Sequence, residues 1–525
     1  MWQHLIQSAL LGIEKKSVNQ EVFPVEIRNF FNQQSNSEQT FLETSALIYF
    51  YMEAGKCPPK MTREADSQIV EETLEIAPSH INEIFGLLDK AKPILKEKLL
   101  NLWLDLLIKK QYIVSPEIVI DLLSIGNSYS EITKSKILRV IGNKGNWIMS
   151  LNSGLQYKKA SKDESVWTEG NTNERKTLLS KMFKTNPEAA ISMLHSTWEQ
   201  EPLVNKRAFL DILKEFRNGV VMVFAENLFE KEFAYNPKEK KTEKECRKIL
   251  ASILLGYRES NLHQSTMKRL TAYLNIEKKK GLLGLGSKKL TDFQLPDEED
   301  GEFWNTASME QTYGFEVKNY DISMFKTANL FWLSCFMEFI PSDAWVGNHF
   351  DTYQAFLDCF LGKEEFKVKI GGKVQPVFLN AMMQNANYFR NNQLSLRLLS
   401  LIPTNEALPL LKTLMPEEFE QFVKKNNYFA DEEILQSGPY NIDESWSPSF
   451  SEYMLSSIYD SLQMTSNLNA MGMLISQYIH TDAYSTLQKY EEKINGSSFY
   501  YKWNTFIYEP VNAVLQIRKL IKSNN

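Results

Sequence analysis

The chain of 525 residues carries 59 Lys and Arg side chains against 65 Asp and Glu, which makes its net charge −6. Hydrophobic residues make up 43% and charged residues 24%, a balance typical of folded proteins that excludes a largely disordered chain. The length exceeds the size at which a single hydrophobic core keeps growing, so we expect several bodies or an extended stack of helices. The mildly acidic charge argues against capture of nucleic acid by the surface as a whole, because phosphate neutralisation needs a basic face.

The cysteines and the first residues of the chain indicate a cytoplasmic protein. The four cysteines are widely spaced and form no Cys-x-x-Cys pair, so neither a disulfide framework nor a zinc site is predicted. The first residues, Met1–Ile6, lack the basic segment of a secretory signal. The longest apolar run, 46–52, is far shorter than the roughly 20 residues of a membrane span. We expect no membrane contact, no metal ion and no cofactor.

The region 1–150 is predicted to form an N-terminal helical region. Its first apolar side chains follow the spacing i, i+3, i+4, i+7 and i+8 of one helix face: Trp2, Leu5, Ile6, Ala9 and Leu10. Further helices are expected over 37–55, 94–110 and 116–126. The last of these has Pro in its first turn and Gly at its end, which are the preferred positions of these two residues.

The region 151–277 has the most regular pattern of the chain. After a loop rich in Gly, Asn and Ser at 142–171, apolar faces recur at helical spacing with short turns between them. The expected helices are 173–184, 187–199, 203–217, 221–233, 243–256 and 265–274. Short connections favour antiparallel helical hairpins. The fold predicted is therefore all-α, an α-solenoid of HEAT-like hairpins that presents an extended surface to other macromolecules.

A charged segment over 278–320 interrupts this pattern. Lys278–Lys280 and Asp297–Asp300 flank a run of glycines, and opposite charge blocks around glycines are typical of a flexible linker. We therefore interpret 278–320 as a joint between two helical bodies.

Two alternatives for this segment are weaker. The glycine run Gly281-x-x-Gly284-x-Gly286 resembles a phosphate loop, but no strand is expected before it and no Gly-Lys-Ser/Thr ends it. The contiguous carboxylates Asp297–Asp300 point in different directions and have no spaced ligand to complete a metal site. The glycine run is interpreted as a flexible linker, with a weak anion site among its lysines as the alternative, and the carboxylates are interpreted as a solvated acidic loop.

The region 321–525 is predicted to be an aromatic-rich helical domain. At most one small β-hairpin is expected in the chain, around 366–378, where apolar and charged residues alternate before two glycines. Most aromatic residues have helical spacing and are expected in the core. The run Phe499–Trp503 is too continuous for one helix face, so Tyr500 and Trp503 are candidate interaction residues.

Several local motifs together resemble a bacterial family of all-helical, HEAT-like proteins, domain of unknown function 5691. The opening Ala9–Lys15 looks like the first-helix signature of that family, although the family usually has Thr and Arg at the positions of Ile13 and Lys15. Gly142–Ile148, followed by Asn152, is similar to its central Gly-x-basic-Gly-x-Trp motif. The resemblance covers most of the chain.

The central motif supplies the remaining candidate interaction residues: Gly142, Lys144, Gly145 and Trp147. Glycines permit a left-handed backbone, Trp147 can anchor a loop between helices, and Lys144 can cap carbonyls at the end of the preceding helix. Members of the family tend to be encoded beside a MoxR-type AAA+ ATPase and a von Willebrand A-domain protein. The resemblance therefore implies an adaptor with these proteins as partners.

The sequence leaves three alternative functions for the chain. The leading one is a non-enzymatic scaffold or adaptor that binds protein partners. The second is a HEAT-like nucleic-acid binder, which would need a basic face made of Lys176, Lys181, Lys206, Arg207, Lys214 and Arg217. The third is an enzyme with its site in the C-terminal half, which would need an acidic pocket near Trp332, Trp345 or Trp446.

Overall fold

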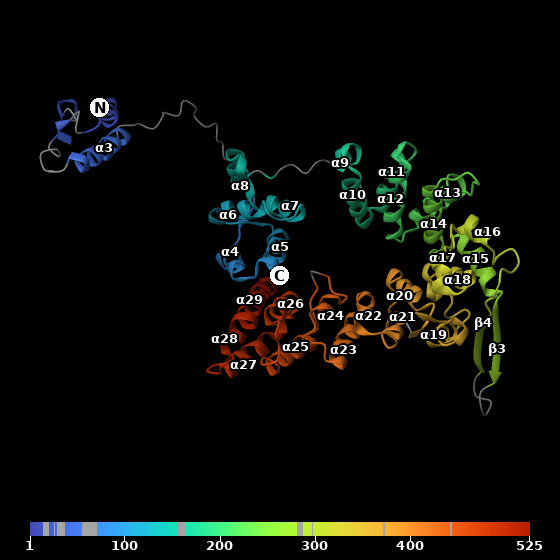
Figure 1. The fold of residues 1–525 in the computed structure, drawn as a ribbon. Helices are drawn as coiled ribbons and strands as arrows, with labels where there is room; N and C mark the ends of the chain where they lie inside the picture. Colours follow the sequence, from blue (N-terminus) through green and yellow to red (C-terminus); the bar gives the residue numbers. More distant parts are fainter. Residues whose placement is uncertain are drawn as a thin grey trace. The chain divides into compact units, whose positions relative to one another are not determined.

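A computed structural model describes residues 1–13, 20–25, 27–28, 37–54, 71–155, 157, 163–280, 287–296, 298–370, 373–441 and 444–524 (Figure 1). The chain divides into two compact units, Met1–Val70 and Glu71–Asn525. Nearly all regular structure is helical, which confirms the all-α class. Over the described ranges, no helix combines the length and apolar character needed to cross a membrane. Within the same ranges, no three His, Cys, Asp or Glu side chains are grouped to hold a metal ion.

The first unit is small and buries little. It contains α1 (Trp2–Leu11), the 3-10 turn η1 (Gln20–Val22) and α3 (Ser37–Ala54). Its buried apolar core consists of Leu5, Phe23, Ile27 and Ile48. Many of its large apolar side chains are exposed: Trp2, Ile6, Leu10, Leu11, Val25, Leu42, Leu47, Tyr49, Phe50, Tyr51 and Met52.

The second unit begins with a group of five helices. They are α4 (Ser79–Leu87), α5 (Pro93–Lys110), α6 (Pro116–Gly126), α7 (Glu131–Val140) and α8 (Gly142–Leu151), with the 3-10 turns η2 (Leu88–Lys90) and η3 (Ser153–Leu155). The boundaries of α5 and α6 agree with the predicted ones to within a residue, because proline begins each helix. A parallel pair of short strands, β1 (Glu75–Ile76) and β2 (Tyr112–Ile113), joins the start of the unit to the end of α5.

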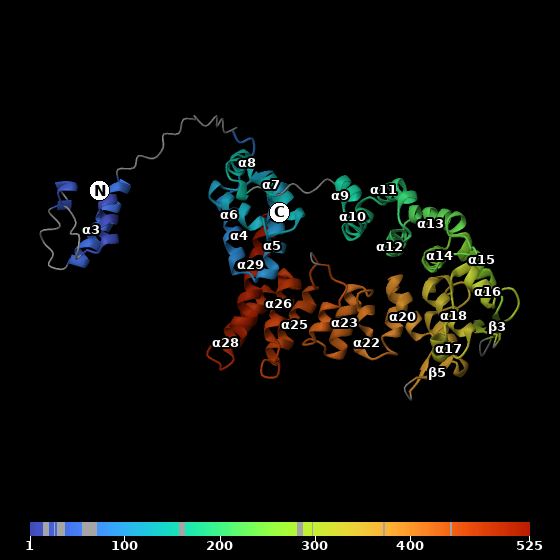
Figure 2. The same cartoon turned by 45° about the horizontal axis from the view of Figure 1, so that its top comes forward.

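The next helices form two rows. They are α9 (Asp163–Glu169), α10 (Thr172–Thr185), α11 (Pro187–Thr197), η4 (Trp198–Gln200), α12 (Leu203–Lys214), α13 (Gly219–Lys231), α14 (Lys241–Leu255) and α15 (Asn261–Thr271). Helices α10, α12 and α14 contact one another in series, and α11 contacts α13 (Figures 1 and 2). Asparagine or serine side chains cap several of these helices, as at Asn171, Asn186, Asn218 and Ser260. All six predicted helices of this region are present.

The interpretation of 278–320 as a flexible linker is wrong for its described residues. Strand β3 (Leu274–Lys280) pairs antiparallel with β4 (Ser287–Phe293), and the short helix α16 (Thr306–Ser308) and π-helix η6 (Met309–Tyr313) follow. Phe293 lies between the two charge blocks and Trp304, Tyr313 and Phe315 follow the second one, and all four aromatic side chains are fully buried. They belong to the largest core cluster of the chain. Gly281–Gly286 and Asp297 lie outside the described residues.

The remaining helices continue to the end of the chain. They are α17 (Asn319–Phe325), α18 (Ala328–Phe339), η7 (Ser342–Ala344), α19 (Tyr353–Leu361), η8 (Glu364–Phe366), α20 (Leu379–Tyr388), α21 (Asn392–Leu398), α22 (Thr404–Leu411), α23 (Pro416–Asn426), α24 (Glu432–Gln436), α25 (Pro448–Asp460), α26 (Leu468–Tyr478), η9 (Thr481–Ala483), α27 (Tyr484–Ile494), α28 (Tyr500–Trp503), the π-helix η10 (Asn504–Tyr508) and α29 (Glu509–Asn524). Strands β5 (Lys367–Ile370) and β6 (Lys373–Pro376) form the hairpin predicted around 366–378. The expectation of at most one hairpin is wrong, because β3–β4 is a second one.

The C-terminal helix packs against the first helices of the same unit. Val514, Ile517 and Ile521 of α29 share a hydrophobic core with residues of α4–α7. Residues 71–141 therefore share a core with the end of the chain and belong to a different unit from residues 1–70, whereas the sequence predicted one region over 1–150. Periodicity along the chain carries no information about which distant helix covers a given apolar face.

Candidate functional site

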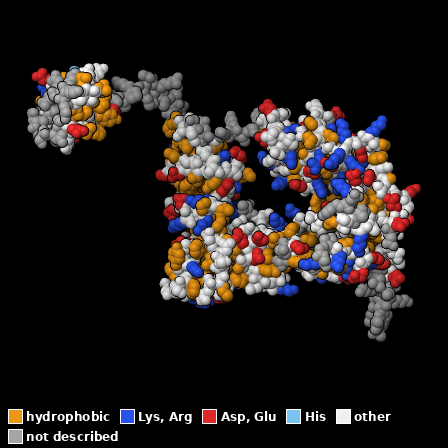
Figure 3. Space-filling view, viewed as in Figure 1, with side chains coloured by type: hydrophobic (Ala, Val, Ile, Leu, Met, Phe, Trp, Pro, Cys, Tyr) orange, Lys and Arg blue, Asp and Glu red, His pale blue; other side chains and the backbone are white. Residues whose placement is uncertain are grey.

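Three lysines on α14 form one face of that helix. Lys241, Lys244 and Lys248 are spaced i, i+3 and i+7, which places their side chains above one another. Together with Arg207 of α12 and Lys318 they line a cleft of about 310 Å³. Figure 3 shows Lys and Arg side chains gathered over α12 and α14. The cleft is therefore a local basic site on a chain whose net charge is −6.

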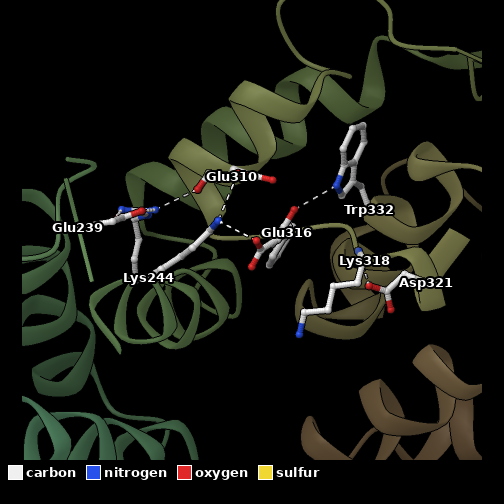
Figure 4. Close-up of polar contacts among 9 residues, drawn as sticks. Glu239, Lys244, Glu310, Glu316, Lys318, Asp321 and Trp332 are labelled. Atoms are coloured by element: carbon white, nitrogen blue, oxygen red, sulfur yellow. Dashed lines mark hydrogen bonds and ion pairs between the residues drawn. The ribbon is translucent and has the colours of Figure 1, made fainter. Parts of the chain in front are cut away.

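The far wall of the cleft is held close to α14 by Gly314. This residue has a left-handed backbone with φ 67°, and a Cβ atom placed on it would lie 3.1 Å from the backbone nitrogen of Lys248. The next residue, Phe315, is fully buried, and its carbonyl accepts a hydrogen bond of 3.2 Å from Nε1 of Trp332 (Figure 4). Backbone contact and burial together fix where the following residues, 316–318, stand against the helix.

Acidic side chains neutralise only part of the positive charge of the cleft. The Lys244 ammonium lies 3.2 Å from a carboxylate oxygen of Glu310 and 3.5 Å from one of Glu316 (Figure 4). Arg207 pairs with Glu245 at 3.1 Å. Five basic side chains line the cleft against three acidic ones, those of Asp211, Glu245 and Glu316.

Three ammonium groups of the cleft remain without an ion pair among the residues that the structure describes. They belong to Lys241, Lys248 and Lys318, and all three residues are exposed. The backbone N–H of Lys318 donates a hydrogen bond of 2.9 Å to Asp321, so its position is fixed while its ammonium faces solvent (Figure 4). These groups give the cleft an unneutralised positive charge that attracts anionic groups.

A buried arginine supports α14 from behind. Arg247 forms a two-pronged pair with Glu239, with 2.6 Å between Nη2 and Oε1, and also donates to the carbonyl of Glu310 at 3.1 Å (Figure 4). Only 1% of Arg247 is exposed. The two Nη atoms of this buried guanidinium thus link α14 to Glu239 and to the backbone of the segment at 310.

The sequence motif at 142–147 begins a helix and is not a loop. Gly142 has φ 66°, and the carboxylate of Glu72 accepts hydrogen bonds of 2.8 Å from the backbone N–H groups of Asn143 and Lys144. Glu72 therefore caps the N-terminus of α8. A Cβ atom at Gly142 would lie 2.6 Å from that carboxylate, and one at Gly145 would lie 2.5 Å from Cβ of Ile141. Close packing thus accounts for both glycines.

The other predicted interaction residues differ in exposure. Lys144 is exposed and Trp147 is half-buried. Tyr500 is 37% exposed, but Trp503 is fully buried, with its ring 5.5 Å from that of Tyr459. The prediction of Trp503 as an exposed interaction residue is wrong, because this ring completes an aromatic cluster. None of the six predicted residues lines the cleft of α14.

Sequence reasoning missed the cleft although part of its signal was present. The stretch Lys238–Glu245 mixes charge signs, which is typical of a solvated turn and helix start. The i, i+3, i+7 spacing of Lys241, Lys244 and Lys248 does indicate one face. The position of Lys318 opposite that face depends on packing between segments far apart in the sequence, which no local pattern reveals.

The fold and the cleft define an all-α protein of paired helices with a charged surface groove. The chain belongs to a family of unknown function, DUF5691, whose model matches residues 4–523. Comparison with curated proteins and with solved structures found no match.

Proposed function

We propose that the chain is a non-enzymatic scaffold that binds an acidic segment of a partner protein in the cleft beside α14. The observation that carries this proposal is the set of three exposed lysines, Lys241, Lys248 and Lys318, which line one cleft and have no ion pair among the described residues. The two rows of helices over α10–α14 support a HEAT-like arrangement. We place the protein in the cytoplasm, since four widely spaced cysteines suit a reducing compartment.

The cleft favours an acidic protein segment over a nucleic acid. Asp211, Glu245 and Glu316 stand among its lysines, and they would repel a continuous phosphate backbone. A peptide with spaced carboxylates can pair with the lysines and donate backbone N–H groups to these acidic side chains. Mixed charge therefore selects a partner of matching pattern.

The basic face required for nucleic-acid binding is partly consumed by contacts within the chain. Lys206 pairs with Glu232 at 2.7 Å, and Arg207 pairs with Glu245 at 3.1 Å. The ammonium of Lys214 lies 4.7 Å from the centre of the Phe339 ring. Three of the six residues proposed for that face are thus engaged.

An enzymatic site in the C-terminal half finds less support. The indoles of Trp332, Trp345 and Trp446 are fully buried in hydrophobic core clusters. The carboxylate of Glu420, also buried, accepts hydrogen bonds from the hydroxyls of Tyr440 and Ser447, both at 2.6 Å. These bonds give the carboxylate a structural role at the start of α25.

The family resemblance directs the choice of partner. We propose that a MoxR-type AAA+ ATPase or a von Willebrand A-domain protein supplies the acidic segment. A tagged chain would be used to capture partners from the native cell, with and without ATP, and the captured proteins would be identified by mass spectrometry. Recovery of neither protein in either condition would contradict this assignment.

Charge reversal tests whether the cleft is the binding surface. The triple variant Lys241→Glu, Lys248→Glu, Lys318→Glu should lose the captured partner, because the cleft then repels acidic groups. A matched variant with three other exposed lysines, Lys184→Glu, Lys425→Glu and Lys489→Glu, has the same net charge and should retain it. Equal loss of partner capture in both variants would show a general effect of charge. Equal retention of the partner would exclude the cleft as the binding surface.

A further inference from the structure

A second cavity, separate from the cleft of α14, lies where four connections of the chain meet. It has a volume of about 510 Å³ and is lined by residues of 217–219, 256–259, 341–343 and 389–393, with Tyr353. This volume lies within the range of small-molecule sites, roughly 300–1,000 Å³. Three of its lining side chains are arginines that come from distant parts of the sequence: Arg217, Arg258 and Arg390.

Arg217 is held in place by the protein itself. Its guanidinium carbon lies 3.7 Å from the centre of the Phe389 ring and 5.1 Å from that of Tyr388. Its Nη2 donates a hydrogen bond of 3.1 Å to the carbonyl of Gly256, where a Cβ atom would lie only 2.6 Å from Nη2. The side chain is thus fixed by a ring, a carbonyl and a glycine before any ligand arrives, so little rotamer entropy is lost on binding.

The rest of the wall is also ordered by internal bonds. Nδ2 of Asn391 donates to the hydroxyl of Tyr353 at 2.6 Å and to that of Ser342 at 3.0 Å, which ties two connections together. Arg390, the preceding residue, has φ 47°, a left-handed backbone that is unfavourable for a residue with a side chain. Strained backbones of this kind collect at binding sites.

The electrostatics of the cavity favour an anion. Helix α13 begins at the wall, at Gly219, so its N-terminal partial positive charge adds to that of the arginines. Two acidic side chains also line the cavity: Asp343 pairs with Arg258 at 3.0 Å, and Glu259 is the other. Arg217 and Arg390 have no ion pair among the residues that the structure describes.

We propose that this arginine pocket binds a small molecule that carries phosphate groups. The guanidinium fork matches the oxygens of a phosphate with two parallel hydrogen bonds. The rings of Tyr257, Tyr353 and Phe389 give the pocket an apolar side against which the rest of such a molecule can pack. The site shares no residue with the α14 cleft, so this binding activity is independent of the proposed scaffold function.

Titration calorimetry of the full-length chain with inorganic pyrophosphate tests the proposal. The wild-type chain should bind at one site, and Arg217→Gln and Arg390→Asn should each weaken binding at least about tenfold, because each removes one charge-assisted contact. Asparagine is chosen at 390 because it tolerates the left-handed backbone. Arg139→Gln, an exposed arginine on α7, and the triple variant of the α14 cleft serve as controls that should bind as the wild type does.

Three results would overturn the proposal. The first is the absence of pyrophosphate binding to the wild-type chain. The second is binding that survives both Arg217→Gln and Arg390→Asn, or that is lost in a control variant. The third is citrate binding as tight as that of pyrophosphate, which would show a site for carboxylates. Circular dichroism of Arg217→Gln and Arg390→Asn checks that each variant is folded. If Arg217→Gln does not fold, loss of pyrophosphate binding in a folded Arg390→Asn variant still supports the pocket.

Discussion

Three cysteine side chains, those of Cys246, Cys335 and Cys359, lie inside the second unit. Burial raises the pKa of the Cys246 and Cys335 thiols to about 12 and that of Cys359 to about 11. Thiol reagents attack the thiolate, so neither reactivity nor metal binding is expected of these groups near neutral pH. Because their pKa values lie above the ordinary 9, the stability that the neutral thiols contribute is present below pH 9 and is lost as the pH rises towards 12.

Thiol labelling checks this expectation. In a Cys57→Ser variant at pH 8, a thiol reagent should label none of the three cysteines in the folded chain within minutes. All three should react once the chain is unfolded in guanidinium chloride. Rapid labelling of any one of them under native conditions would show that its burial is transient.

A second prediction at the residue scale concerns Gly142, the first residue of α8. Gly142→Ala places a side chain on a left-handed backbone and 2.6 Å from the Glu72 carboxylate. We therefore expect the free energy of unfolding to fall by about 1–2 kcal/mol and the cap that Glu72 forms on α8 to weaken. Gly86→Ala in α4, where the added Cβ meets no atom within 4 Å, should be neutral or stabilise the chain by up to about 1 kcal/mol. Hydrogen exchange over 142–151 should accelerate in the first variant alone.

At the scale of elements, a glycine sets the distance between α26 and the π-helix η10. A Cβ atom added to Gly472 would lie 1.7 Å from the carbonyl oxygen of Phe506, which is backbone and has no rotamer to adopt. Gly472→Ala must therefore push the two elements apart. We expect the free energy of unfolding to fall by about 3 kcal/mol or more, which exceeds the usual cost of overpacking.

Thermal unfolding and hydrogen exchange over 500–508 measure this effect. Asn469→Ala, at an exposed position of the same helix, is the matched control and should be neutral or slightly stabilising, since alanine has the higher helix propensity. If Gly472→Ala unfolds at the temperature of the wild type, the contact between α26 and η10 is looser than described.

At the scale of the whole second unit, the two ends of its chain support each other. Ile517 of α29 is fully buried among residues of α4–α7. Two cations strengthen this junction: Lys98 of α5 donates to the carbonyl of Gln477 at 3.0 Å, and Arg518 of α29 donates to the same carbonyl at 2.7 Å. Both bonds satisfy the C-terminus of α26.

Ile517→Ala should therefore weaken both ends of the unit together. We expect the free energy of unfolding to fall by about 2–5 kcal/mol, as for other large-to-small changes in a core. Hydrogen exchange should become faster in α5 as well as in α29. Ile120→Ala, at a side chain that is 53% exposed, should have little effect. Faster exchange confined to α29 would contradict a shared core.

The agreement between sequence and structure is best where the signals are local. Proline at the start of α5 and α6, and asparagine before α10 and α11, set helix boundaries within a few residues along the chain. The prediction of a flexible linker was wrong over 287–315 because the structure of this stretch depends on contacts with distant parts of the chain. Its blocks of charged residues predict exposure to solvent, whereas the few aromatic residues that enter the core decide its structure.

The helical class, the family and the helix boundaries predicted before residue 278 follow from local sequence signals, because capping and apolar periodicity act over a few residues. Only the tertiary structure decided which distant segments meet: Lys318 with the lysine face of α14, Arg217 with Gly256 and Phe389, and α29 with α4 and α5. These contacts arise when apolar faces bury one another across large sequence separations. The cleft and the arginine pocket are products of that packing, so no short motif announces them.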